Sequence, residues 1–266
     1  GGVASSITWI LVAPLIQWLE VTEVTAVLAI PLLVTSGLAV QYARRYQPNS
    51  RHPSDAHVAS RFRWGDLNPT QRHALVRLGI AGSAESLVFA ATSLMWITWF
   101  TVQFEDPALA VLLASLYGPF QVVGRLLEMR FGAYFDARLT GLVALLAIPL
   151  SLGLAMIPHE SIAVLAMILF GMGHGVLSIT FGFVVSLFFE PHVYGRAKGW
   201  LAAPKAIAAA AGPLFAGVIF TAEPRWFLPA TCLVVLLGLI AFMGVIRLPT
   251  RLSSRPNTPY ETTDHA

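Results

Sequence analysis

Apolar runs about as long as a bilayer is thick recur along the whole chain, and they constrain its fold more than any other feature. A transmembrane helix needs about 20 consecutive apolar residues, and runs of this length follow one another between short polar stretches. Only 12% of the 266 residues are charged, whereas soluble domains carry about 25%. A soluble chain of this size could not enclose so many apolar helices. The sequence therefore predicts an all-α bundle of membrane-spanning helices.

Eight spans are expected, divided by one long polar connection. The predicted spans are residues 3–19, 24–43, 75–100, 107–127, 139–157, 161–188, 199–221 and 226–246. Segment 44–74 lacks apolar periodicity, which is typical of a flexible linker. We expect it to join two helices within residues 1–43 to a six-helix bundle at residues 75–247. Residues 248–266 are predicted to form a disordered tail.

Basic residues are distributed unevenly between the two sides of the predicted membrane. Of the 17 Lys and Arg residues, only Arg225 falls on the side opposite segment 44–74. Connections rich in Lys and Arg stay in the cytoplasm. We therefore expect a multi-pass protein of the cell (inner) membrane, with its linker and its C-terminus in the cytoplasm. Because this bias accounts for the basic residues, no nucleic-acid partner is expected.

Polar side chains follow one face of the fourth predicted span. Tyr117, Gln121, Arg125 and Glu128 are four, four and three residues apart, which places them on one helical face. Charged groups in hydrocarbon cost a few kcal/mol each, so they face protein or a water-filled cavity. We expect this polar line to face a cavity or a seam between domains. The candidate gating residues at the cytoplasmic end are Arg125, Glu128 and Arg130.

From the second span onward, uncharged spans occur at every third position. Spans 24–43, 139–157 and 226–246 contain no charged residue, whereas each of the third, fourth, sixth and seventh spans does or carries a histidine. Helices without charge can face lipid, while helices with charge cannot do so cheaply. The period of three therefore predicts repeated three-helix units, each with one outer helix, around a hydrated middle.

Several polar residues inside the spans are candidates for solute binding or coupling. His174 is expected near the midplane, where transporter sites usually lie, and its ring can bind a solute or carry a proton. Glu85 is a candidate proton carrier, and Lys205 either attracts an anion or extends back to the interface. Each of these residues could instead make a structural hydrogen bond. The full candidate set is Glu85, Thr92, Trp96, Tyr117, Gln121, His174, Ser178 and Lys205.

Two motifs resemble parts of the major facilitator superfamily of transporters. The segment GRLLEMRFG at 124–132 resembles the signature that follows the family's eighth span, although Met129 separates the acid from the base. YGRAKGWLAAPKAIAAAAGPLFAGV at 194–218 resembles the eleventh span. Together with GMGHG, these segments resemble a bacterial branch of unassigned substrate. The resemblance implies twelve spans in two six-helix bundles, of which residues 1–247 would supply spans five to twelve.

The resemblance also implies a function. It indicates a secondary transporter that works by alternating access. Arg125, Lys205 and His174 favour a small polar or anionic solute, and Glu85 favours coupling to protons. Its partners would be the solute, protons and the lipid bilayer, and the full-length protein would be a monomer. The alternatives are a transport-inactive sensor or partner protein, and an intramembrane hydrolase built on Ser178, which lacks a GxSxG motif. We expect no enzymatic activity, no cofactor and no metal.

Overall fold

The computed structural model describes residues 19–45 and 64–250, and within these ranges the chain is helical or forms short connections, without strands. The chain divides into two compact units, Gly1–Arg63 and Trp64–Ala266. The all-α prediction is confirmed for the part of the chain that the structure describes.

The described part of the first unit is a single helix, α2 (Val21–Arg45). It contains the predicted span 24–43, but its apolar stretch, Ala29–Tyr42, is shorter than the six spanning helices of the second unit. At the start of the helix, the Glu20 backbone N–H donates to the Glu23 carboxylate at 3.0 Å. The first predicted span lies almost entirely outside the described residues.

The second unit consists of six long helices. They are α3 (Pro69–Phe104), α4 (Pro107–Phe131), α5 (Ala137–Leu154), α6 (Glu160–Phe188), α7 (Pro191–Ala222) and α8 (Phe227–Ile246), with the short 3-10 turns η2 (Trp64–Asp66), η3 (Gly132–Tyr134) and η4 (Pro224–Trp226). Within the described ranges, these six helices are long and apolar enough to cross a membrane. They match the last six predicted spans, as a multi-pass membrane protein requires.

Two of these helices begin earlier than the sequence predicted, because proline starts them. At α3, the Asn68 side chain accepts from the Gln71 backbone N–H at 2.7 Å, and the Gln71 side chain accepts from the Asn68 N–H at 3.2 Å. This capping box satisfies two donors at the helix start, with Pro69 in the first turn, where its missing N–H costs nothing. Likewise, α7 begins at Pro191 and not at residue 199.

The predicted linker and tail are only partly described. The linker prediction of 44–74 is wrong at both ends, because α2 continues to Arg45 and α3 begins at Pro69. Its central residues lie outside the described part of the chain. Of the predicted tail 248–266, only the first three residues are described.

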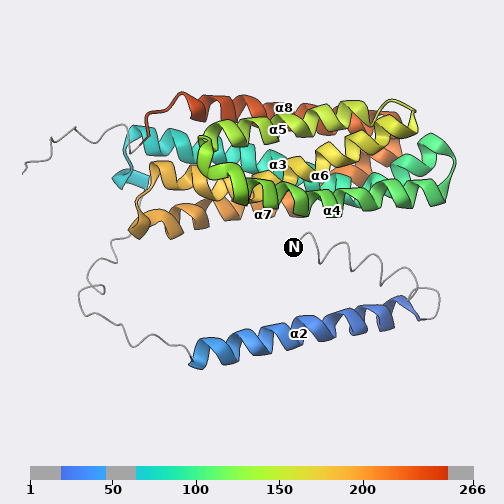
Figure 1. Cartoon of the computed structure of the whole chain (residues 1–266), viewed down its shortest axis with the longest axis horizontal. Helices are drawn as coiled ribbons and strands as arrows, with labels where there is room; N and C mark the ends of the chain where they lie inside the picture. Colours follow the sequence, from blue (N-terminus) through green and yellow to red (C-terminus); the bar gives the residue numbers. More distant parts are fainter. Residues whose placement is uncertain (1–18, 46–63, 251–266) are drawn as a thin grey trace, which may run out of the picture. The chain divides into compact units, whose positions relative to one another are not determined.

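The six helices form two interlocked sets of three consecutive helices, α3–α5 and α6–α8. From the first set, α3 packs mainly against α7 and α8 of the second set. From the second set, α6 packs mainly against α4 and α5 of the first set. The first helix of each set therefore lies between the second and third helices of the other set. In Figure 1, α5 and α8 run along one side of the bundle and α4 and α7 along the opposite side, with α3 and α6 between them. The predicted spans 139–157 and 226–246, which contain no charged residue, thus lie in two helices that pack together, α5 and α8, and the other helices occupy the remaining positions.

Close contact between α4 and α6 depends on glycine. A Cβ atom added to Gly175 would collide with the Gln121 carbonyl oxygen, and one added to Gly171 would collide with the Tyr117 carbonyl oxygen. A Cβ on Gly124 of α4 would in turn meet the backbone of α6. Small residues let two helix backbones approach in this way inside a membrane. The glycines of GMGHG therefore serve helix packing.

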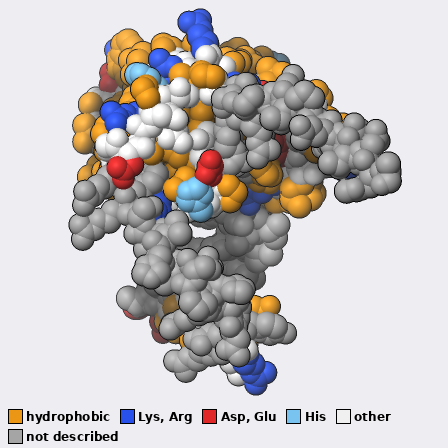
Figure 2. Space-filling view, turned by 90° about the vertical axis from the view of Figure 1, so that its left-hand side faces the viewer, with side chains coloured by type: hydrophobic (Ala, Val, Ile, Leu, Met, Phe, Trp, Pro, Cys, Tyr) orange, Lys and Arg blue, Asp and Glu red, His pale blue; other side chains and the backbone are white. Residues whose placement is uncertain are grey.

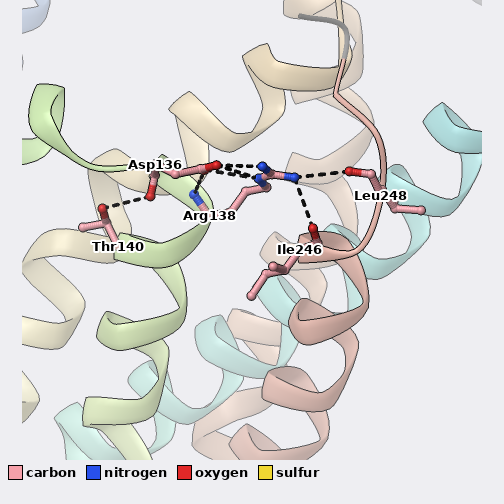
Figure 3. A network of polar contacts seen from close by, with 5 residues as sticks. All are labelled: Asp136, Arg138, Thr140, Ile246 and Leu248. Carbon is pink, nitrogen blue, oxygen red and sulfur yellow. Dashed lines mark hydrogen bonds and ion pairs between the residues drawn. The ribbon is translucent and has the colours of Figure 1, made fainter. Parts of the chain in front are cut away.

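A hydrogen-bond network centred on Arg138 joins the start of α5 to the end of α8 (Figure 3). Arg138 donates to both carboxylate oxygens of Asp136, at 2.7–3.1 Å. It also donates to the carbonyl oxygens of Ile246 and Leu248 at 3.1 and 3.2 Å. Asp136 caps α5 by accepting from the Arg138 backbone N–H at 2.8 Å. The last carbonyl groups of a helix lack hydrogen-bond donors within that helix, and here the Arg138 side chain is the donor.

Replacing Arg138 by Gln is expected to lower the apparent unfolding temperature at pH 7 by about 2–4 °C, or about 1 kcal/mol. The hydrogen bond from Arg138 holds the pKa of Asp136 below its ordinary value. The pair therefore stabilises the fold above about pH 4, and this contribution is lost as the pH falls through the lowered pKa. Thermal melts at pH 7 and pH 3 test this, with exposed Arg247→Gln as the control. An equal effect of both variants would contradict it.

Basic side chains gather at one end of the bundle. In the described part of the second unit, Arg225 is the one Lys or Arg at the other end, between α7 and α8. Figure 2 shows the basic end, where blue Lys and Arg side chains are spread among apolar ones.

Candidate functional site

A buried acid–histidine contact joins the two central helices of the bundle. The Glu85 side chain on α3 lies with one carboxylate oxygen 2.9 Å from Nδ1 of His174 on α6. Both side chains are shielded, with 13% and 2% of their surfaces exposed. Glu85 lies 16 residues beyond the start of α3, or about 24 Å along the helix axis. The two residues that the sequence singled out as proton carriers therefore meet deep inside the bundle.

A third helix brings a cation to the same carboxylate. Lys205 of α7 places Nζ 3.7 Å from the second carboxylate oxygen of Glu85, and its side chain is 33% exposed. The Ser86 hydroxyl donates to that oxygen at 3.2 Å. The lysine stem packs against Gly82, where a Cβ would lie 3.0 Å from Lys205 Cδ. Three residues that are far apart in the sequence therefore form one site on α3, α6 and α7.

The environment of His174 leaves one of its nitrogens able to take a proton. Its ring packs against Phe89 and Phe170, with centroid separations of 4.4 and 4.7 Å. An ionised Glu85 can only accept, so it fixes a proton on Nδ1. Nε2 is buried without a hydrogen-bond partner among the described residues. In the neutral ring this atom is a lone-pair acceptor, and a second proton there would give an imidazolium beside a carboxylate.

Next to this site, a cavity of about 310 Å³ lies between α6 and α7. On each helix the lining residues lie three, four and seven positions after the first one, so each set forms one helical face. The lining is Ser178, Phe181, Gly182 and Val185 from α6, Lys198, Leu201, Ala202 and Lys205 from α7, and Leu78 from α3. A more open cavity of about 560 Å³ shares Ser178, Gly182 and Lys198 and extends to Tyr194. The cavity is thus mostly apolar, with two ammonium groups.

Arg125 reaches the wall of this cavity from α4. Its Nε donates to the Ser178 hydroxyl oxygen at 3.0 Å, and that hydroxyl donates to the Gly175 carbonyl at 2.7 Å. The serine proton therefore points at a backbone carbonyl and not at a base. A hydrolase built on Ser178 would need a base to accept that proton.

The rest of the polar line faces α6, which corrects the expectation of a cavity or domain seam. Glu128 is buried and accepts from the Thr180 hydroxyl of α6 at 3.0 Å. It also packs against Gly132, where a Cβ would lie 2.9 Å from the carboxylate. Among the described ion pairs within 4.0 Å, none joins Arg125 to Glu128. Arg130 is exposed and lies over the Phe131 ring at 5.5 Å. The three candidate gating residues therefore have separate contacts.

Four other candidates lie in packed surroundings. Tyr117 and Gln121 are buried on the α4 face that meets α6, and the Tyr117 ring lies edge-on to Phe170 at 6.2 Å. Thr92 is fully buried and donates to the Val88 carbonyl of its own helix at 2.7 Å. Trp96 is 1% exposed and stacks on an adjacent phenylalanine. Packing accounts for the positions of these four side chains.

Sequence reasoning missed Lys198, which lies on the same face of α7 as Lys205. The reason is the early start of α7, which turns the predicted loop before residue 199 into two more helical turns. Two lysines seven residues apart would have shown the shared face. Thr180 was also missed, because a threonine in a membrane span gives no signal until its partner, Glu128, is known.

No protein-family model matches this chain, and no curated protein matches its sequence. The evidence for the six-helix bundle and its buried polar site therefore comes from this chain's own residues.

Proposed function

We propose that this chain is part of a secondary transporter of the major facilitator type, which moves a small polar or anionic solute and couples that movement to protons. The observation that carries the proposal is the contact of Glu85 with both His174 and Lys205 inside a bundle of membrane-length helices. Ionisable groups at such depth are costly in a membrane and mark solute or proton pathways. They lie beside a cavity that a small solute could enter.

The helix arrangement supports the family proposal independently of the site. The interlocking of α3–α5 with α6–α8 is the arrangement expected of two inverted three-helix repeats, on which many transporters are built. In this proposal the chain supplies spans five to twelve, its basic end faces the cytoplasm, and the full-length protein is a monomer in the inner membrane. The first two of the eight proposed spans belong to residues 1–43.

Proton coupling follows from the chemistry of the pair. Starting from an ionised Glu85 and a neutral His174, the pair can take up one proton, either on the carboxylate or on Nε2 of the ring, where the resulting imidazolium faces the carboxylate. Protonation of Glu85 removes the attraction that draws Lys205 toward it. The lysine then interacts more strongly with a solute in the adjacent cavity. Binding of the solute and binding of the proton are in this way linked.

The main alternative is a transport-inactive protein that binds a solute and signals its presence. It uses the same cavity and the same lysines, and it differs in that no solute crosses the membrane. A hydrolase is disfavoured because the Ser178 proton is directed to the Gly175 carbonyl. We accordingly propose a protein without enzymatic activity, cofactor or metal.

Vesicles containing the purified full-length protein test the proposal. With an interior at pH 7.5 and a medium at pH 5.5, we expect at least one labelled organic acid from a panel to accumulate at least fivefold over protein-free vesicles. A protonophore should abolish that accumulation. A panel member that raises the unfolding temperature without crossing the membrane would instead favour the sensor. Failure of every member both to bind and to cross would refute the proposal.

A further inference from the structure

Two lysines face one cavity from a single helix. Lys198 and Lys205 are seven residues apart on α7, about 10 Å along the helix axis, and both line the 310 Å³ cavity between α6 and α7. Lys205 Nζ lies 4.7 Å from the Phe181 ring centroid, which holds it on the cavity side of its helix. Lys198 lies over Gly182, where a Cβ atom would come within 3.9 Å of Nζ. The two lysines therefore reach one cavity from positions two helical turns apart on α7.

The charge around this cavity is unbalanced. Lys198 and Lys205 line it, and Arg125 bonds to Ser178 in its wall, while Glu85 is the carboxylate in contact with a lining residue. Glu128 bonds to Thr180, which is not part of the lining. Three cations against one carboxylate leave two positive charges among the described residues. Lys198 is exposed and the Lys205 side chain is one-third exposed, so this excess is only partly screened by solvent and attracts an anion to the cavity.

We infer that the cavity between α6 and α7 binds a small dianion whose two charged groups are separated, with Lys198 holding one group and Lys205 the other. The inference rests on the proposed function and deepens it by naming the class of solute. A dianion balances the two excess charges, whereas a monoanion leaves one of them unpaired. The separation of the lysines favours an extended dicarboxylate over a compact dianion, and the apolar walls formed by Phe181 and Val185 suit a short hydrocarbon chain between the two groups.

Calorimetric titration of the chain in lipid nanodiscs at pH 7 tests this inference. Three probes are compared: succinate, butyrate of the same carbon count, and sulfate as a compact dianion. We expect succinate to bind at least tenfold more tightly than either of the others. Lys198→Met and Lys205→Met should each bring succinate to the affinity of butyrate, whereas Lys205→Arg should retain the preference. Arg247→Met is the control, because it removes an exposed charge at the same end and should change nothing.

Several results would overturn the inference. One is equal affinity for succinate and butyrate; another is sulfate binding as tightly as succinate; a third is a Lys198→Met variant that still prefers the dicarboxylate. Because binding is measured at equilibrium, failure of transport does not affect the readout. Lysine-dependent binding of succinate without movement across vesicles would sink the transport proposal and leave the dianion site standing. Uptake of monoanions alone would support the transport proposal and overturn the dianion site.

Discussion

Glu85→Gln is expected to abolish accumulation driven by a pH gradient while leaving exchange of solute across the membrane intact. Glutamine keeps the size of the side chain and its ability to accept from His174 Nδ1, which is 2.9 Å from the native carboxylate. It cannot bind a proton at this site, so the driving force of the gradient is lost. In vesicles, we expect gradient-driven uptake to fall at least tenfold, to the level without protein. Counterflow of labelled against unlabelled solute should remain within about threefold.

The chain offers a matched control for this experiment. Glu190 and His192 form a second acid–histidine pair, with atoms 3.2 Å apart, but both side chains are 58% exposed at the end of the bundle. Glu190→Gln removes the same chemical group without touching the buried site, and we expect full coupling. Proton-coupled uptake that survives in Glu85→Gln would show that the proton travels elsewhere. Loss of counterflow as well would place Glu85 in solute binding and not in coupling.

The sequence predicted the elements of the bundle well because apolar length is a local property. Six of the predicted spans correspond to α3–α8, and the residues chosen as proton carriers, Glu85 and His174, meet in the structure. Each was chosen for being ionisable within an apolar run, and His174 also for its expected position near the midplane. Their pairing could not be predicted, because it depends on how α3 and α6 cross, and no local pattern encodes that crossing.

Helix starts were the least accurate part, and the error had consequences for the site. The sequence pairs Asn68-Pro69 and Glu190-Pro191 each begin a helix. Hydropathy places the boundary where the apolar run starts, whereas the backbone begins its helix at the proline, one or two turns earlier. Lys198 was therefore assigned to a loop, and the second lysine of the cavity was overlooked.

The polar line on α4 illustrates a different limit. Its spacing correctly predicted one face, since Tyr117, Gln121 and Glu128 are all buried on the side of α6. Which surface that face would meet was not predictable, because a neighbouring helix and a water-filled cavity both satisfy polar groups. The Thr180 hydroxyl of α6 donates to Glu128, which shows that this face meets a neighbouring helix.

Gly175→Ala is expected to be the most damaging single-methyl substitution in the described part of α6. The added Cβ would collide with the Gln121 carbonyl oxygen and would lie 3.1 Å from the Arg125 backbone nitrogen. Both are backbone atoms of α4, so no rotamer change relieves the contact and the helices must separate. Overpacking of this kind costs about 3 kcal/mol, or about 6–12 °C in the apparent unfolding temperature of a chain this size.

Two other glycines serve as comparisons for the size of this destabilisation. A Cβ on Gly173 would lie 3.0 Å from the Ala144 carbonyl oxygen of α5, so Gly173→Ala should cost less than Gly175→Ala. Gly217 of α7 has no atom within 4 Å of that position, and alanine there should be neutral or slightly stabilising because it favours the helix. Thermal melts of the three variants should follow this order. Separation of α4 from α6 should also weaken the bond from Arg125 to Ser178 at the cavity wall, so Gly175→Ala should lower succinate affinity where Gly217→Ala does not. Equal melting temperatures for all three would mean that α4 and α6 are not in backbone contact, and the placement of Arg125 at the cavity would then have no structural basis.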